Sequence, residues 1–364
     1  MKKPDVLDLS PEELIKLLAE LGQKPYRARQ LMAWIYQRNV LSIDEMTDMP
    51  LSLREALSER LRFGAATVET VARAADGNTA KYLFRLEDGN AVEAVSMREQ
   101  GGRHTLCISS QVGCALGCTF CATGGLGFRR NLTTGEILFQ VIAVGHGEGE
   151  VKNVVFMGMG EPLLNVEDVI RAVRALVDPA RFAFGTRKVT VSTAGIIPGI
   201  ERLAESGVKV HLALSLNSPF QEQREKLMPI ARKYPLAQLL TAVEGYGERT
   251  GKPALLEYVL LEGVNTGEEA AREVARIAGR LGSKVNLIEY NAVENIPFSC
   301  PSSAETLKFR DLLAKAGVTA TIRFRRGREI AAGCGQLAAR AKAQDSQRRH
   351  RVCTAHRGDT EDGV

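Results

Sequence analysis

Long apolar runs are missing from this chain of 364 residues, although 45% of its residues are hydrophobic. No stretch approaches the roughly 20 consecutive apolar residues that a transmembrane helix needs. The opening residues, MKKPDVLDLSPEEL, also lack the apolar core of a secretory signal. We therefore expect no membrane span and no export, and we predict a cytoplasmic protein.

The chain also lacks a large net charge of either sign. Lys and Arg number 48 against 43 Asp and Glu, which gives a net charge of +5. The basic residues are nevertheless clustered, and clusters beside a functional loop favour contacts with nucleic-acid phosphates. Taken singly, each cluster is better explained as a solvated surface run. The clusters are Arg129–Arg130, then Arg323, Arg325, Arg326 and Arg328, and finally Arg348, Arg349 and Arg351.

Cysteine is well represented, and its placement is the most informative feature of the chain. The seven cysteines follow no secretory leader, so they do not predict a disulfide framework. Cys114, Cys118 and Cys121 have the spacing C-x₃-C-x₂-C within GCALGCTFCATG. Three thiolates can hold three irons of a cubane iron–sulfur cluster and leave the fourth iron open to a small molecule. Structural zinc usually has four protein ligands, and no histidine follows closely, so zinc is the weaker alternative.

Local patterns divide the chain into four parts. Residues 1–62 predict a helical module that begins with the capping box of Ser10 to Glu13. Residues 63–103 alternate polar with apolar positions around two Asp-Gly turn signals and predict a β-meander. Residues 104–340 alternate strands with helices and predict an α/β fold, a partial (β/α)6 barrel with a parallel sheet. Residues 341–364 are polar and predict a disordered tail.

Polar residues follow the ends of several predicted barrel strands. The carboxyl ends of barrel strands form the catalytic face of such folds, so the sequence predicts one site there. The cysteine loop follows strand 105–110, Gly158–Pro162 follows strand 153–157, Ser192–Gly195 follows strand 188–192, Ser215–Asn217 follows strand 209–215, and Asn291 follows strand 285–290.

The cysteine loop resembles the signature of radical S-adenosylmethionine (SAM) enzymes, which bind SAM at the open iron of a [4Fe-4S] cluster. On this interpretation Cys114, Cys118 and Cys121 hold the cluster. Gly160 and Glu161 then lie near the SAM ammonium group. Hydrogen bonds to the SAM carboxylate, ribose and adenine come from Ser192, Ser215, Leu216, Asn217 and Asn291. The alternative for the run GMGEP is a turn that only ends a strand.

Two cysteines outside the loop have informative surroundings. Cys107 lies on the strand that leads into the loop, so we expect it near the barrel mouth. Cys334 lies between Gly333 and Gly335, which suits an exposed, mobile thiol. A free cysteine is more often a small buried hydrophobe, so the local pattern alone leaves both interpretations open. Cys300 and Cys353 have no comparable context.

Together these motifs resemble the RlmN/Cfr family of radical SAM RNA methyltransferases, and most closely its adenine-C2 branch. The similar segments are CISSQVGCALGCTFCATGGLGFRRNLTTGEI, VVFMGMGEPLLN, KVTVSTAGI, LALSLN, LMPIARKYPL, VNLIEYN, GCGQLA and the N-terminal YRARQLMAWIYQRN. The resemblance implies methylation of an adenine in 23S rRNA, at the peptidyl transferase centre, and in tRNA. It also implies a flavodoxin-type or other electron donor and a monomeric enzyme.

The resemblance further implies a two-stage reaction in which Cys334 first takes a methyl group from one SAM. A second SAM is cleaved at the cluster, and the 5′-deoxyadenosyl radical activates that methyl group for addition to adenine carbon 2. A glutamate then removes the ring proton, and Cys107 attacks Cys334 to release the product and leave a disulfide. Glu93 stands at the matching place for this base, with Glu99 as the alternative.

Three positions depart from the family pattern and affect the expected substrate more than the reaction. Asn217 replaces a histidine, Arg328-Glu329 replaces an Asp-Asp or Ser-Asp pair, and Gly333 replaces an alanine. Three alternatives therefore stay open. They are Cfr-like methylation of carbon 8 of the same adenine, a radical SAM reaction on a protein or small molecule, and a non-enzymatic zinc RNA-binding module.

Overall fold

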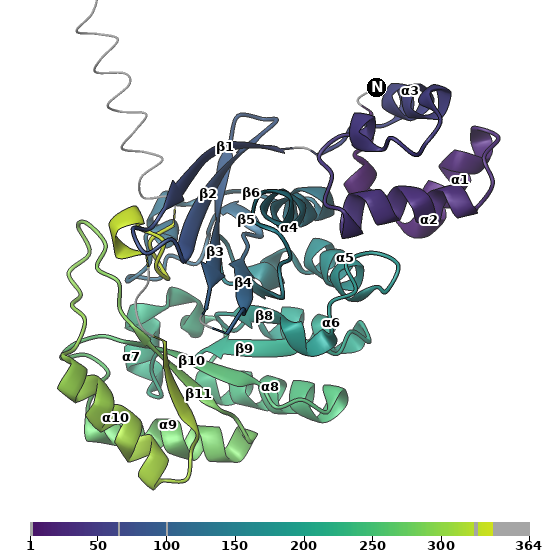
Figure 1. The fold of residues 1–364 in the computed structure, drawn as a ribbon. Helices are drawn as coiled ribbons and strands as arrows, with labels where there is room; N and C mark the ends of the chain where they lie inside the picture. The colour runs from purple at the N-terminus through teal and green to yellow at the C-terminus, as the bar shows by residue number, and fades with distance from the viewer. Residues whose placement is uncertain (1–2, 65, 100, 324–326, 338–364) are drawn as a thin grey trace, which may run out of the picture.

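The computed structural model describes residues 3–64, 66–99, 101–323 and 327–337 (Figure 1). The predicted tail, Arg325, Arg326 and Cys353 lie outside these ranges. Helices come first along the chain, a small antiparallel set of strands follows, and an α/β barrel completes the described part. In that part of the chain, no helix has both the length and the apolar character needed to cross a membrane.

The first N-terminal helix begins where the capping pattern predicts. Ser10 Oγ accepts a hydrogen bond from Glu13 N at 3.1 Å, and Glu13 Oε2 accepts one from Ser10 N at 2.7 Å. Leu14 and Leu18 then face the interior of the module. The elements are α1 (Pro11–Glu20), α2 (Tyr26–Met32), the π-helical segment η2 (Ala33–Gln37) and α3 (Leu51–Arg60).

The predicted meander forms, but it also extends the barrel sheet. Strands β1 (Ala66–Arg73), β2 (Thr79–Leu86) and β3 (Ala91–Arg98) are antiparallel. Gly77 and Gly89 adopt positive φ angles of 68° and 80° in the two turns, as the Asp-Gly signals predict. Since β3 pairs antiparallel with the first barrel strand, the two parts share one ten-stranded sheet.

The barrel strands run parallel to one another, which confirms the predicted α/β class. In sheet order they are β4 (His104–Cys107), β7 (Asn153–Phe156), β8 (Val189–Thr193), β9 (His211–Ser215), β10 (Leu255–Leu260), β11 (Val285–Glu289) and β12 (Ala320–Arg323). The helices that lie between these strands along the chain are α4 (Thr134–Glu148), α5 (Val166–Val177), α6 (Ile197–Glu205), α7 (Gln221–Leu227), α8 (Leu236–Thr250), α9 (Glu268–Leu281) and α10 (Ser303–Lys315). No ladder among the described residues joins β12 to β4, so the barrel is partial.

Residues 327–337, which include η8 (Arg328–Ile330), return from β12 toward the meander (Figure 1). Lys81 Nζ on β2 donates to Ala331 O at 3.4 Å, and Ala75 N donates to Glu329 Oε1 at 3.0 Å. Ala122 N in the cysteine loop donates to Gly335 O at 2.7 Å. These contacts hold the segment that carries Cys334 against the cysteine loop.

Candidate active site

The cysteine loop is shaped by a short hairpin that follows β4. Strands β5 (Gln111–Gly113) and β6 (Phe128–Asn131) pair antiparallel, and Cys114 N donates to Gly127 O at 3.0 Å. A Cβ atom at Gly113 would lie 1.8 Å from Gly127 O, and its φ is 74°. Only glycine permits this close approach, which explains part of the glycine content around the loop.

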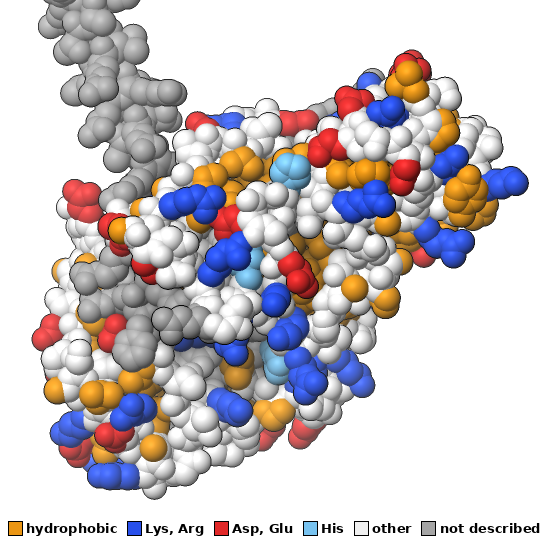
Figure 2. All heavy atoms as spheres, in the orientation of Figure 1, with side chains coloured by type: hydrophobic (Ala, Val, Ile, Leu, Met, Phe, Trp, Pro, Cys, Tyr) orange, Lys and Arg blue, Asp and Glu red, His pale blue; other side chains and the backbone are white. Residues whose placement is uncertain are grey.

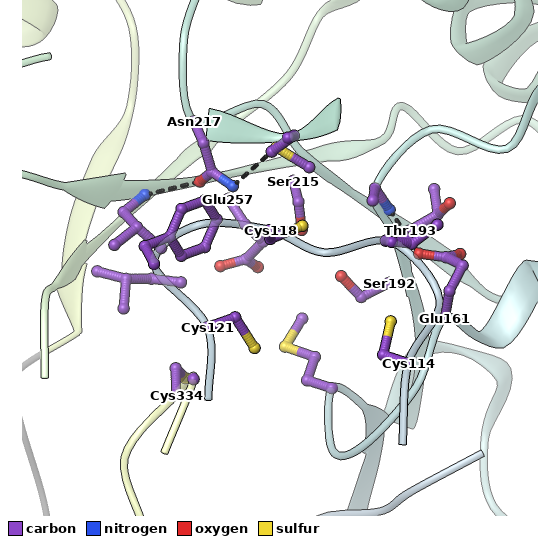
Figure 3. Close-up of a pocket in the computed structure, with 18 of the residues that line it drawn as sticks. Cys114, Cys118, Cys121, Glu161, Ser192, Thr193, Ser215, Asn217, Glu257 and Cys334 are labelled. Atoms are coloured by element: carbon purple, nitrogen blue, oxygen red, sulfur yellow. Dashed lines mark hydrogen bonds between the residues drawn. The ribbon is translucent and has the colours of Figure 1, made fainter. Parts of the chain in front are cut away.

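The loop opens onto a cavity at the carboxyl ends of the barrel strands (Figure 3). The cavity encloses about 940 Å³, counting the part open to solvent. Most residues predicted for the site line it: Cys114, Cys118, Cys121, Gly160, Glu161, Ser192, Ser215, Asn217 and Cys334. The structure therefore brings segments that are far apart in the sequence to one place.

Four predicted residues do not line this cavity: Cys107, Glu93, Leu216 and Asn291. Leu216 is buried, and its backbone N donates to Glu257 O at 2.9 Å. Asn291 is also buried and lies close to Gly333, where a Cβ atom would stand 2.4 Å from Asn291 Cγ. Gly333, which stands where the family has alanine, thus makes room for the Asn291 amide.

Glu161 and Asn217 are both held by the protein backbone at the cavity wall. Glu161 Oε2 accepts from Ala194 N at 2.8 Å and Oε1 accepts from Leu163 N at 3.1 Å. Burial raises the pKa of the Glu161 carboxyl to about 7, against these backbone hydrogen bonds, which lower it. Asn217 Oδ1 accepts from Val259 N at 3.0 Å, a bond that joins β9 to β10. Asparagine at this position therefore has a packing role in addition to any ligand contact.

Cys107 and Cys334 come from opposite ends of the barrel sequence and approach each other. Burial, and to a lesser extent negative charge on the nearby Cys334, raise the pKa of the Cys107 thiol to about 12. The Arg323 guanidinium opposes both effects. Cys334 is exposed to the cavity, as its glycine neighbours predict. Although solvent reaches it there, the surrounding protein desolvates its thiolate and raises its pKa.

Glu93 lies on β3 in a buried ion pair. Its Oε1 atom lies 3.0 Å from Lys81 Nζ, and both side chains are buried. The same Lys81 ammonium donates to Ala331 O, so one side chain joins Glu93 to the segment that carries Cys334. Glu99, the alternative base, forms an exposed pair with Arg103 at the far end of β3 and has no comparable link.

Comparison with known proteins identifies the chain from end to end. Residues 108–275 match the radical SAM superfamily, and residues 4–62 match the ribosomal RNA large subunit methyltransferase N-terminal domain. The dual-specificity RNA methyltransferase RlmN of Anaeromyxobacter dehalogenans (strain 2CP-C) is 46% identical over 355 residues, covering 95% of each chain. This chain belongs to the RlmN family of radical SAM methyltransferases.

Other members of the RlmN family agree with this assignment. The protein of the same name from Nitratidesulfovibrio vulgaris (strain DP4) is 45% identical, covering 94% of this chain and 96% of its own. A radical SAM methyltransferase from Sphaerobacter thermophilus superposes with a TM-score of 0.88 at 42% identity, covering 92% of this chain and 99% of that one. Enzymes of this family use a [4Fe-4S] cluster and SAM, so the thiol arrangement can be tested against that cofactor.

The arrangement of the three loop thiols suits the separate corners of a cubane cluster. Among the described residues, no three His, Cys, Asp or Glu side chains converge as one ion would require. The thiols instead line one cavity from different sides (Figure 3). A cubane takes each thiolate on a different iron, so this arrangement suits the family's cluster.

Arg224 is a residue of this site that the sequence patterns did not identify. Its side chain is fully buried behind the loop and donates to Ala194 O at 2.6 Å and to Leu216 O at 3.2 Å. Its Nη1 atom has no hydrogen-bond partner among the described residues. Burial lowers the pKa of Arg224 to about 10, while the nearby Cys118 opposes that shift. A buried cation here offsets negative charge on the loop thiolates, and only the tertiary structure brings it there.

Proposed function

We propose that this protein methylates carbon 2 of an adenine in 23S rRNA, at the peptidyl transferase centre, and in tRNA. The relatives named above are dual-specificity RNA methyltransferases. The observation that carries the proposal is that Cys334, from the far end of the barrel, lines the same cavity as the three loop cysteines, with Cys107 near enough to Cys334 to interact with it electrostatically. A site with three cluster ligands and two further cysteines can hold a methyl group on one thiol and release it with the other.

In the proposed reaction, Cys114, Cys118 and Cys121 hold the cluster, and Glu161, Ser192 and Ser215 contribute to SAM binding. The bound cofactors supply a 5′-deoxyadenosyl radical. Cys334, which is exposed to the cavity, bonds as a thiolate to the methyl carbon of one SAM; the bond from that carbon to the SAM sulfur breaks, S-adenosylhomocysteine leaves, and Cys334 carries the methyl group as a thioether. This thiol is the nucleophile because it is exposed to the cavity, whereas Cys107 is buried. The radical then removes a hydrogen atom from this methyl group, the resulting carbon radical bonds to carbon 2 of the adenine, and the adduct returns one electron to the bound cluster.

The later steps belong to Glu93 and Cys107. Glu93 accepts the ring proton of the adenine, with Lys81 holding its carboxylate in place. Cys107 then bonds as a thiolate to the sulfur of Cys334; the electron pair of the breaking sulfur–carbon bond stays with the transferred carbon, which takes up a proton and becomes the methyl group, and a disulfide remains. An external electron donor, of flavodoxin type or another class, reduces this disulfide and supplies electrons to the cluster.

The N-terminal module, residues 1–62, is proposed to dock the RNA onto the catalytic residues 104–340, with residues 63–103 between them. Its surface offers stacking groups: Tyr26 is 46% exposed with the Arg27 guanidinium 4.9 Å from its ring centroid, and Arg38 lies 3.9 Å from the Trp34 ring. Aromatic and guanidinium faces of this kind stack on unpaired bases. Lys and Arg side chains also extend across the middle of the face in Figure 2.

Arg130 contributes less to RNA binding than its position in the sequence suggests. It pairs with Asp88 at 2.5 Å and with Glu136 at 2.7 Å. Arg129 Nη1 donates to Asn90 Oδ1 at 2.8 Å. These two arginines therefore connect the cysteine-loop hairpin to the meander. We expect other basic residues to make the RNA contacts.

The test is mass spectrometry of nucleosides from 23S rRNA and tRNA after anaerobic reaction with the cluster-reconstituted protein. The proposal expects 2-methyladenosine, and its distribution between the two RNAs reports the specificity. A product of 8-methyladenosine would place the protein with the Cfr-like enzymes. SAM cleavage without either product would mean that the substrate is a different molecule. Fractionation and size-exclusion chromatography would check the cytoplasmic, monomeric state that we propose.

A further inference from the structure

Glu257 is a buried acid on the cavity wall that the sequence patterns did not single out. It lies in the middle of β10, where it pairs with Ser215 on β9 and Asn286 on β11. Its side chain is only 3% exposed, yet it lines the cavity. Figure 3 shows its carboxylate pointing into the space between Cys118 and Cys121.

The two carboxylate oxygens of Glu257 have different surroundings. Oε1 accepts from Asn286 Nδ2 at 2.8 Å and lies 3.4 Å from Arg323 Nη2. Thr321 Oγ1 donates to Asn286 Oδ1 at 2.6 Å, which orients that amide. Oε2 has no hydrogen-bond partner among the described residues. An unpaired buried acceptor destabilises the protein unless a ligand donates to it, so the cavity presents one open acceptor.

We propose that Glu257 Oε2 accepts a hydrogen bond from a ribose hydroxyl of bound SAM. The inference rests on the proposed location of SAM in this cavity. Asn286 and Arg323 already hold the other oxygen of Glu257, and we infer that the partner of Oε2 is a neutral donor. The sulfonium of SAM carries no hydrogen on sulfur, and Glu161 on the opposite wall is the acid proposed for the ammonium group. Carboxylates commonly hold ribose hydroxyls in nucleotide sites.

The test compares S-adenosylhomocysteine with its 2′-deoxy and 3′-deoxy analogues by isothermal titration calorimetry. The proteins are cluster-reconstituted wild type, Glu257→Gln, Arg323→Gln and the surface control Glu244→Gln. In Glu257→Gln, Asn286 and Arg323 retain the amide oxygen, so the amide NH2 faces the ligand. We expect this variant to bind S-adenosylhomocysteine about tenfold more weakly than wild type.

The deoxy analogues make the test specific to the ribose. One of them should bind wild type about tenfold more weakly than the parent ligand, and Glu257→Gln should show no further loss with it. Arg323→Gln and Glu244→Gln should keep the wild-type difference between parent and deoxy ligands. Iron content and melting temperature, measured on every variant, report folding and cluster assembly independently of binding.

Three results would overturn the inference. Unchanged affinity in Glu257→Gln would show that Oε2 makes no ligand contact, and equal losses for parent and deoxy ligands would show that it does not contact the ribose. Loss of the ribose preference in Arg323→Gln as well would show that Glu257 acts only through its ion pair. Failure of the cluster-loaded wild type to bind S-adenosylhomocysteine would instead overturn the proposed SAM location, and with it this inference.

Discussion

The two sets of cysteines in the site are held in different ways. Cys114, Cys118 and Cys121 lie within one short loop whose shape comes from its own hairpin and its close glycine contact. Cys107 and Cys334 come from β4 and from the segment after β12, and contacts from β2 and the cysteine loop hold that segment. Cluster binding therefore depends mainly on local structure, whereas the cysteine pair depends on tertiary packing. Changes far from the cluster should be able to separate the two.

Cys118→Ala should have the largest effect, because it removes a cluster ligand and leaves two thiols. Iron and sulfide content after reconstitution should fall far below the wild-type level, and SAM cleavage should be lost. Cys300→Ala, a cysteine outside the cavity, is the matched control and should load normally. Normal iron content in Cys118→Ala would contradict the ligand assignment.

Cys334→Ala should separate cluster binding from RNA methylation. The cluster should assemble with normal iron content, while RNA methylation should fall by more than about a thousandfold, because the residue that carries the methyl group is gone. Quantitative nucleoside mass spectrometry and an absorbance spectrum measure the two effects. Retained methylation would contradict the two-stage scheme.

Cys107→Ala should stop the reaction one step later. Without the second thiol, RNA should stay covalently attached to Cys334 through the transferred carbon. A denaturing gel with labelled RNA would show the adduct, and peptide mass spectrometry would locate it. The double variant Cys107→Ala/Cys334→Ala is the control and should form none. Product release at the wild-type rate in Cys107→Ala would remove that role from Cys107.

Lys81→Met should affect the function of the cysteine pair, Cys107 and Cys334, without changing either cysteine. It removes the buried ammonium group that pairs with Glu93 and donates to Ala331 O. Breaking a buried ion pair on one side destabilises a protein by about 3–5 kcal/mol, so the melting temperature should drop. Methylation should fall while iron content stays near normal. The double variant Lys81→Met/Glu93→Gln should recover stability but not activity; equal activity in all these variants would exclude a role for the pair.

The smallest expected effect is a pH dependence of thiol labelling in the protein without cluster. Iodoacetamide reacts with thiolates, and burial raises the pKa of Cys107 to about 12. Cys334 is exposed to the cavity whereas Cys107 is buried, so Cys334 should label first at pH 8, and labelling of Cys107 should accelerate as the pH rises. The folded state holds the Cys107 proton more tightly than the unfolded state, so this thiol makes unfolding easier above about pH 9. Faster labelling of Cys107 than of Cys334 at pH 8 would contradict the structure.

Much of the fold could be predicted because its signals are local. The capping box of Ser10 and Glu13 begins α1, the Asp-Gly turns join β1 to β3, and the alternation of strands and helices continues to β12. The continuity of the meander with the barrel sheet was not predicted, because strand pairing across elements leaves no short-range pattern. The positions of Leu216 and Asn291 away from the cavity wall were not predicted, for the same reason.

The sequence by itself determined the cluster loop, since the spacing of three cysteines and the glycines around them specify a local structure. It also determined the barrel class and, through whole-chain motifs, the family. Only the tertiary structure decided that Lys81 joins Glu93 to the Cys334 segment, that Arg224 lies buried behind Cys118, and that Glu257 keeps one oxygen open. These residues are distant in sequence and have ordinary neighbours. Their chemistry arises from burial and from partners that only the packed barrel brings within reach.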